Sequence, residues 1–136
     1  MRFRYLKLIG FVVLLFVVST GLAQAQSKTL YWDRWDVDIV VRTDGTFRVV
    51  ERQTIEFTSG TFTFGIRGVD VRRLDHISDV EVREGDQVFQ EGSSGQPWTF
   101  TTYMEGNEFK IKWYFPPTSD SRHTYTIAYT VHGGLR

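Results

Sequence analysis

The sequence predicts an all-β protein: a single antiparallel, immunoglobulin-like β-sandwich of about seven or eight strands, preceded by a signal peptide. Three observations support this fold class. Short runs of alternating apolar and polar residues recur along the chain, turn-forming glycines separate them, and no long run of helical period follows the amino end. The length of 136 residues suits one domain.

The amino end has the features of a secretory leader. Its positive region, apolar run and small-x-small cleavage pattern are Arg2, Arg4 and Lys7, then Leu8 to Val18, then Ala23-Gln24-Ala25. We expect cleavage after Ala25, which divides the chain into a signal peptide, residues 1–25, and a sandwich domain, residues 26–136. An uncleaved anchor is the alternative, but it needs about 20 apolar residues, and Ser19 interrupts this run early.

The composition excludes several kinds of site. Cleavage removes three of the 16 basic residues and none of the 16 acidic ones, which leaves 13 against 16 and a formal charge of −3. A nucleic-acid-binding domain is typically basic, so we expect no nucleic-acid partner. The chain has no cysteine, which excludes disulfides, thiolate metal sites and cysteine nucleophiles.

The first hairpin, between Arg34 and Phe57, is the strongest local signal, because Asp44 and Gly45 join two apolar-patterned runs. A three-residue loop, Thr43 to Gly45, with Gly45 left-handed gives one mostly apolar face and one polar face. The opposing pairs are then Val41 and Phe47, Ile39 and Val49, Trp35 and Gln53, and, on the polar face, Asp36 and Arg52. A two-residue loop would mix the faces and oppose two carboxylates, so we favour the bulged loop.

The middle of the chain contains three further strands. Residues 26–33 form a lead-in to the hairpin, and after it Phe62, Phe64 and Ile66 alternate with small residues in a third strand. A second hairpin joins Ile77–Arg83 to Gln87–Gln90. Its Val80 and Val82 face either Val88 or Phe89, depending on the turn.

The last third of the chain has the clearest period of two. Trp98–Tyr103 pairs with Glu108–Phe115, and Pro116-Pro117 then breaks the sheet because proline cannot donate to a ladder. A final strand follows. The residues expected to face inward are Phe109, Ile111, Trp113 and Phe115, then Tyr125, Ile127, Tyr129 and Val131.

No motif for catalysis, a cofactor or a metal is present. His76, His123 and His132 lack metal-ligand spacing. The chain has no nucleophile elbow, phosphate-binding loop or dinucleotide fingerprint. We therefore predict no enzyme, no cofactor and no metal site.

Glu51 departs from the pattern, since the hairpin register places it on the apolar face. A carboxylate there needs a partner, and Arg67, which follows the third strand, is the candidate for a structural ion pair; a ligand contact is the alternative. Arg67 also belongs to a basic cluster with Arg72 and Arg73. That cluster either meets anionic headgroups or an acidic polymer, or is a solvated connection neutralised by acidic neighbours.

Aromatic residues suggest a second type of binding surface. The candidates for stacking on a ligand are Tyr31, Trp32, Tyr103 and Tyr114. A flat, solvent-facing cluster of these rings would favour a carbohydrate or cell-wall binding module. Closure of the core edge by Tyr31 and Trp32 is the alternative.

Three groups of residues carry a family resemblance: Thr43 to Glu51, then Phe57, Gly60, Phe62, Arg67 and Val69, and finally Tyr125 to Tyr129. Together they resemble the amino-terminal domain of the predicted membrane proteins in family 2207 of the domains of unknown function. An Arg-x-Ile-Pro-like step appears here as Arg67 to Asp70, without the proline. The resemblance implies an extracytoplasmic β domain whose full-length relatives continue into transmembrane helices and a cytoplasmic tail, and it implies no catalytic residues.

We therefore expect a non-enzymatic module exported to the periplasm or surface of a bacterial cell. Its partner is an unknown protein or cell-envelope component, or its role is structural; a carbohydrate or cell-wall binding module is the alternative. Because Gly133–Arg136 contains no transmembrane helix, we expect a fragment of a membrane-associated parent or a stand-alone relative. A membrane tether is then expected only through the leader or a missing C-terminal segment.

Overall fold

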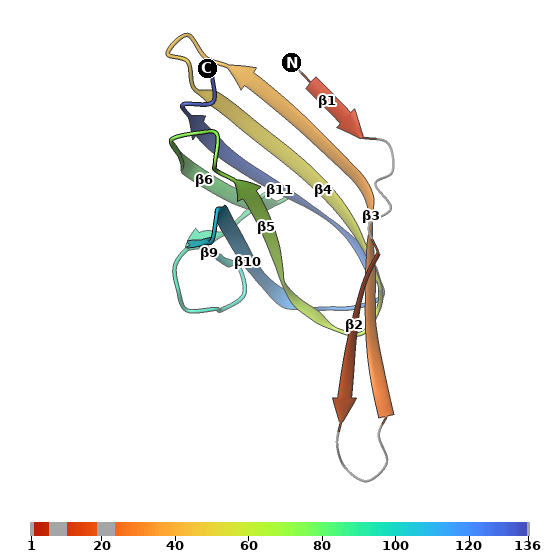
Figure 1. The fold of residues 1–136 in the computed structure, drawn as a ribbon. Helices are drawn as coiled ribbons and strands as arrows, with labels where there is room; N and C mark the ends of the chain where they lie inside the picture. The colour runs from red at the N-terminus through yellow and green to blue at the C-terminus, as the bar shows by residue number, and fades with distance from the viewer. Residues whose placement is uncertain (1, 6–10, 19–23, 136) are drawn as a thin grey trace.

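The structure is a computed structural model that describes residues 2–5, 11–18 and 24–135. Within these residues all regular secondary structure consists of β-strands, and the strands form two facing sheets (Figure 1). The strands are β1 (Arg2–Tyr5), β2 (Phe11–Val18), β3 (Gln24–Val41), β4 (Phe47–Ser59), β5 (Phe62–Asp70), β6 (His76–Glu84), β7 (Gln87–Val88), β8 (Gln90–Glu91), β9 (Thr99–Glu105), β10 (Glu108–Thr118) and β11 (Ser121–His132). The all-β prediction is confirmed.

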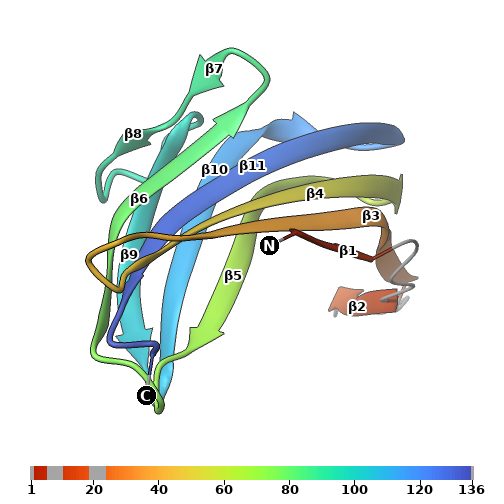
Figure 2. The same cartoon turned by 90° about the horizontal axis from the view of Figure 1, so that it is seen from above.

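The larger sheet has the order β1-β3-β4-β11-β6-β7, with β2 also paired to β3, and the smaller sheet has the order β5-β10-β9-β8. All pairs are antiparallel except β8 with β9, so the prediction of a purely antiparallel sandwich was wrong at this short pair. In Figure 2 the ribbons of β3 and β5 stand apart at one side of the molecule. Among the described strands, β5 is the last strand of the smaller sheet on this side, and β3 is followed in the larger sheet by β1 and β2 of the predicted leader.

The predicted leader contributes β1 and β2, which both pair with β3. In Figure 1, β2 and the first part of β3 form a ribbon that projects beyond the two sheets. Much of the leader signal, including Lys7 and Ala23, lies outside the described residues. Cleavage after Ala25 stays a prediction.

The first hairpin has the predicted register. Val41 lies opposite Phe47, Ile39 opposite Val49, and the ladder continues in step to Trp35 opposite Gln53. The loop closes through hydrogen bonds from the Arg42 amide to the Thr46 carbonyl (2.8 Å) and from the Gly45 amide to the Arg42 carbonyl (3.0 Å). Gly45 has φ +86°, as the bulged loop requires. The lead-in of residues 26–33 was assigned wrongly, because β3 already includes it.

The third strand and the Pro116-Pro117 segment differ from the prediction. β10 continues through Pro116 and Pro117 to Thr118, and its ladder with β5 shifts register there. Because proline is tolerated at a bulge, the strand bends instead of ending. On β5 this shift leaves Phe62 buried but Phe64 and Ile66 exposed, at 45% and 42%.

The second strand of the second hairpin differs from the prediction. β6 pairs with β7, but the predicted strand of residues 87–90 divides at Phe89 into β7 of the larger sheet and β8 of the smaller one. Phe89 is buried, and its amide donates to the Val82 carbonyl (2.9 Å), whereas Val88 is exposed. Phe89 is thus the residue that packs in the core, and this division together with the leader strands raises the strand number above the predicted seven or eight.

The core lies between the sheets. Strand β11 supplies Tyr125, Ile127, Tyr129 and Val131, and β10 supplies Ile111, Trp113 and Phe115, all buried as predicted. Ala128 and Thr130 on the other face of β11 are buried too. The last strand is therefore covered on both faces in its second half, and not on one face as predicted.

Candidate functional site

A bulge in β3 brings two tryptophans onto one face. The β3–β4 ladder skips Asp33, so that Trp32 lies opposite Ile55 and Trp35 lies opposite Gln53. Ile55 and Gln53 are buried, hence both tryptophans face the space between the sheets. Their ring centroids are 6.1 Å apart with the planes at 22°. Simple alternation along the strand would have placed the two rings on opposite faces.

Between β3 and β5 the space between the sheets is open to solvent. We call this opening the β3–β5 groove. Its larger part has a volume of about 610 Å³. The residues lining this part are Trp35, Val37, Ile39, Phe47, Val49, Glu51, Arg67, Val69, Arg73, Leu74, Tyr129, Val131 and Gly134. A smaller part of about 270 Å³ lies between Lys28, Leu30 and Trp32 of β3 and Phe62–Ile66 of β5.

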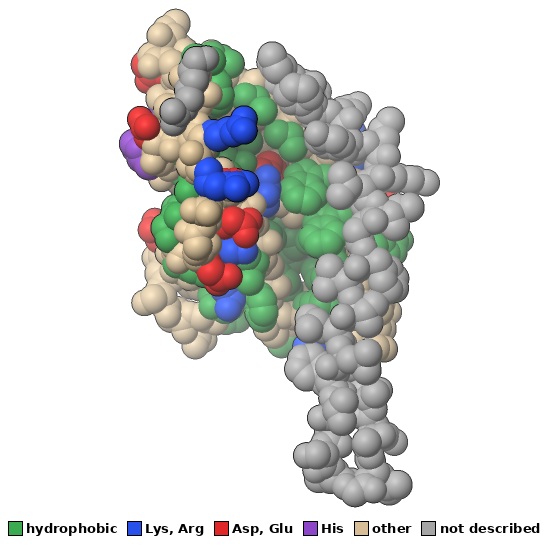
Figure 3. All heavy atoms as spheres, in the orientation of Figure 1, with side chains coloured by type: hydrophobic (Ala, Val, Ile, Leu, Met, Phe, Trp, Pro, Cys, Tyr) green, Lys and Arg blue, Asp and Glu red, His purple; other side chains and the backbone are tan. Residues whose placement is uncertain are grey.

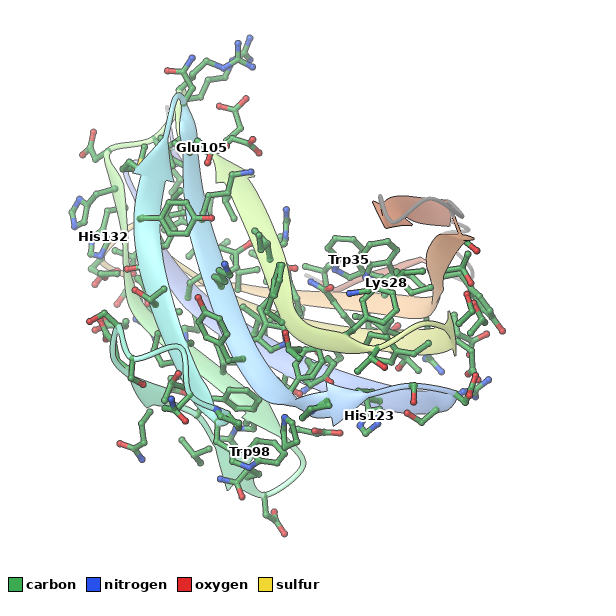
Figure 4. All side chains as sticks on the ribbon, turned by 90° about the horizontal axis from the view of Figure 1, so that it is seen from below. Lys28, Trp35, Trp98, Glu105, His123 and His132 are labelled. Carbon is green, nitrogen blue, oxygen red and sulfur yellow. The ribbon has the colours of Figure 1, made fainter. Side chains whose placement is uncertain are left out.

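Figures 3 and 4 show the setting of this groove. Hydrophobic side chains gather in the middle of the face in Figure 3, and Lys and Arg side chains, with Asp and Glu side chains among them, form a border along one side of them. In Figure 4, Trp35 and Lys28 lie in the space between β3 and β5. The groove is within the size range of small-ligand and peptide sites, and its walls are mainly apolar.

The floor of the groove holds one buried carboxylate, Glu51, whose side chain is 1% exposed. Arg67 Nε donates to both of its oxygens (2.8 and 3.1 Å). The Tyr129 hydroxyl donates to Oε2 (2.6 Å), and Gln53 Nε2 donates to Oε1 (3.3 Å). Both oxygens thus accept hydrogen bonds from within the protein, so the carboxylate links β4 to β5 and β11.

The ion pair is the one that the sequence predicts between Glu51 and Arg67. Arg67 reaches it because the shifted register of β5 turns this residue toward the larger sheet. Its guanidinium also lies over the Trp35 ring, 5.1 Å from the centroid, and donates to the Gly68 carbonyl. Arg67 therefore belongs to β5, which ends at Asp70, so the predicted solvated connection starts only after Asp70.

Electrostatics agree with a structural role for this cluster. Burial lowers the pKa of the Arg67 guanidinium, but the hydrogen bond and charge of Glu51 outweigh that effect and raise it above its usual value. Burial raises the pKa of the Tyr129 hydroxyl well above its usual value, and the negative charge of Glu51 raises it further. Arg67 thus stays charged and Tyr129 stays a neutral donor.

Two indole donors among the described residues that line the groove, those of Trp35 and Trp113, are left without an acceptor. Among the described residues, the buried Trp35 indole nitrogen has no hydrogen-bond partner, whereas Trp32 Nε1 donates to Gln53 Oε1 (3.0 Å). A buried donor without an acceptor costs free energy, about 1–3 kcal/mol. A bound molecule that offers an acceptor beside Trp35 would recover it.

The predicted cross-strand pair, Asp36 and Arg52, lies at directly opposite positions of β3 and β4. Arg52 NH1 is 2.9 Å from Asp38 Oδ2, one step along the same face. Asp36 Oδ2 is 2.7 Å from Arg34 Nε. Asp36 and Arg52 thus lie opposite each other across the ladder, while the ion pairs join Arg52 to Asp38 and Arg34 to Asp36.

The four aromatic candidates do not form one platform. Trp32 points into the groove, and Tyr31, opposite Glu56, lies on the outer face of the larger sheet. Tyr103 and Tyr114 lie on the outer face of the smaller sheet, where Tyr103 is opposite Lys110, four residues from Tyr114. The structure instead pairs Trp32 with Trp35, and Tyr114 with Phe64 (ring centroids 6.3 Å apart); sequence reasoning missed both pairs.

The histidines form two polar contacts at the strand ends. His76 and His132 stack with centroids 4.0 Å apart, and Ser78 contacts His132 Nε2 (2.8 Å). His123 pairs with Glu84 through Nδ1 and lies 3.0 Å from Ser121 Oγ through Nε2. Neither group lines the β3–β5 groove. No cluster of three or more potential metal ligands occurs within the described part of the chain.

Comparison with known proteins gives one match. A family model described as the N-terminal domain of a predicted membrane protein (DUF2207) matches residues 31–136. The chain belongs to this family. No curated protein and no solved structure matches it.

The DUF2207 match covers the elements that build the groove. It begins within β3, just before Trp32, and includes β4, β5 and β11, which supply Glu51, Arg67 and Tyr129. No helix that could span a membrane occurs in the part of this DUF2207 chain that the structure describes.

Proposed function

We propose that the chain is the non-enzymatic, extracytoplasmic binding module of a bacterial membrane protein and that the β3–β5 groove is its binding surface. The observation that carries this proposal is the apolar groove of about 610 Å³ on the open side of the sandwich. Exposed apolar surfaces of this kind usually mark binding sites, because leaving them in water is costly. The leader pattern and membership of a predicted membrane protein family support the location.

The site supports binding better than catalysis. Both oxygens of Glu51 are occupied by protein donors, which leaves no carboxylate in the groove to accept a proton from a substrate. The row Ser121, His123, Glu84 has the order of a hydrolase triad, but it lies outside the groove. We therefore expect wild-type protein and the Ser121→Ala variant to hydrolyse p-nitrophenyl acetate at the same background rate. Loss of a measurable rate in Ser121→Ala would overturn the non-enzymatic part of the proposal.

The proposal includes an immunoglobulin-like scaffold. Four long strands, β3-β4-β11-β6, face three, β5-β10-β9, which are the strand numbers of a constant-type immunoglobulin domain. The last strand lies in the larger sheet here, in contrast to that arrangement.

A site-specific cross-link tests the binding surface. A photoreactive amino acid is placed at Leu74 in the groove wall, and at the exposed Val88 of β7 as the control. We expect one adduct of defined mass from position 74 in producing cells and none from position 88. The identified protein, purified, should bind the wild type and lose binding at least tenfold with Leu74→Arg but not with Val88→Arg.

Two results would overturn this function. Adducts from position 88 alone would place the binding surface elsewhere. Quenching of tryptophan fluorescence by cell-wall sugars, unaffected by Leu74→Arg, would favour a carbohydrate-binding module in its place. The location is tested by the mass of the exported protein: a chain starting at Gln26 fits export with cleavage, and a retained leader indicates a signal anchor.

A further inference from the structure

The outer edge of β3 lies directly beside the groove. On its inner side β3 pairs with β4, and on its outer side the described strands that pair with it, β1 and β2, both belong to the predicted leader. Removal of the leader would uncover a row of backbone amides and carbonyls. Such an edge accepts a further strand readily.

We propose that this edge and the β3–β5 groove together bind an extended segment of a partner protein, in which basic residues alternate with large apolar ones, as an antiparallel strand. This proposal rests on the function proposed above and names the class of partner. The strand would join the larger sheet opposite residues 35–38 of β3.

A strand of this chain, β1, already occupies the outer edge of β3. β1 pairs antiparallel with β3 in the register Arg2 opposite Asp38, Phe3 opposite Val37, Arg4 opposite Asp36 and Tyr5 opposite Trp35. The edge is thus compatible in length and direction with a short extended segment. The seated sequence alternates basic and aromatic residues.

Apolar and acidic side chains alternate along the paired part of β3. Trp35, Val37 and Ile39 face the groove, whereas Asp36 and Asp38 face the other side. A strand added here places every second side chain over the groove, and the others beside the two carboxylates.

The same charges disfavour a second copy of this chain at the edge. If β3 paired antiparallel with β3 of another molecule around Val37, Asp36 of each copy would lie opposite Asp38 of the other. Like charges at directly opposite positions destabilise a strand pair. A basic partner strand has the complementary charge.

The probe is an acetylated and amidated peptide with the sequence of residues 2–7, Arg-Phe-Arg-Tyr-Leu-Lys, added to the exported protein starting at Gln26. We expect saturable binding and slower amide hydrogen exchange across residues 35–38. A peptide of the same composition with its two arginines adjacent should bind at least tenfold more weakly. Equal binding of both peptides, or no binding, would overturn the proposal.

Variants separate this contact from the groove alone. Asp38→Lys should weaken the peptide at least tenfold and Asp38→Asn less, while Asp86→Lys on the distant β6–β7 turn should leave binding unchanged. Melting curves of each variant show whether the fold is kept. If the cross-linked partner binds through Leu74 but Asp38→Asn and Asp38→Lys have no effect, this inference fails and the proposed function stands.

Protein that keeps its leader tests the same edge within one molecule. There we expect slow exchange at residues 35–38 in the wild type and at least tenfold faster exchange in the Arg2→Asp, Arg4→Asp double variant, because four acidic residues would then face one another. Unchanged exchange would overturn the proposal.

Discussion

Among single residues, Glu51 shows most clearly how an exception in the sequence pattern corresponds to a contact in the structure. It interrupts an apolar face, and the structure places it under Arg67, Tyr129 and Gln53 with almost no solvent contact. Three donors replace the water that the carboxylate loses on folding. The cluster joins the two sheets at the floor of the groove.

A double-mutant cycle measures this link. Glu51→Gln and Arg67→Met should each destabilise the protein by about 3–5 kcal/mol, because each leaves the other charge buried without its partner. We expect the double variant to lose clearly less than the sum, by at least about 1 kcal/mol, in urea unfolding. The half-exposed pair Arg52 and Asp38 is the control, with an expected coupling under about 1 kcal/mol. Additive losses would show that Glu51 and Arg67 do not interact.

Gly45 is the residue that fixes the first hairpin. Its φ of +86° lies in the left-handed region, and no atom lies within 4 Å of a Cβ built on it, so a substitution meets strain but no clash. Gly45→Val should destabilise the protein by about 1–2 kcal/mol. Gly45→Asn should cost less, since asparagine tolerates this region. Thermal melting compares the three proteins, and equal melting temperatures would contradict the bulged loop.

At the scale of elements, bulges decide which side chains meet. The skip at Asp33 brings Trp32 and Trp35 to one face, and the shift at Pro116-Pro117 turns Arg67 inward while Phe64 and Ile66 face solvent. Residues left without an opposite partner at such a position interrupt the regular alternation there. The groove therefore owes its two tryptophans and its arginine to irregular positions in otherwise regular strands.

Gly65 on β5 tests this arrangement. A Cβ there would lie 2.4 Å from the buried Trp113 ring, so the strand approaches β10 closely only because this residue has no side chain. Gly65→Ala should destabilise the protein by about 1–3 kcal/mol through overpacking, measured by urea unfolding. Gly92→Ala, where no atom lies within 4 Å of the added Cβ, should be nearly neutral. A neutral Gly65→Ala would mean that β5 and Trp113 are farther apart in solution.

At the scale of the whole molecule, two buried tyrosines of β11 couple stability to alkaline pH. Burial raises the pKa of Tyr125 and of Tyr129 well above the usual value of about 10, and the charges of Glu84 and Glu51 add to this. The neutral hydroxyls are thus favoured in the folded state. Their contribution is complete below about pH 10 and is lost as the pH rises above it, because the unfolded chain ionises first.

The expected slope is about 1.4 kcal/mol of unfolding free energy per pH unit for each tyrosine above pH 10. Urea unfolding at several alkaline pH values measures it. Tyr129→Phe and Tyr125→Phe should each reduce the slope by about half. Tyr129→Phe should also lower the stability at all pH values, because it removes the hydrogen bond to Glu51. A slope that neither variant changes would assign the alkaline loss to other groups.

The sequence by itself determined the fold class, the first hairpin with its register, the inward faces of β10 and β11, and the position of Glu51 on an apolar face. These follow from a side-chain period of two and from the conformational demand on Gly45, which are local properties. The sequence also indicated Arg67 as the partner of Glu51, because a buried carboxylate requires a cation.

The remaining features of the groove and of the core depend on contacts between distant parts of the chain. The tertiary structure placed Phe89 at the switch between sheets, paired Trp32 with Trp35, turned Phe64 and Ile66 outward, and left the side between β3 and β5 open as a groove. Bulges cause most of these differences, and a bulge depends on the register of strands far apart in the chain. The alternation of apolar and polar residues within one strand does not indicate where its pairing with a neighbouring strand will leave a residue unpaired. The groove could therefore not be derived from the local sequence pattern.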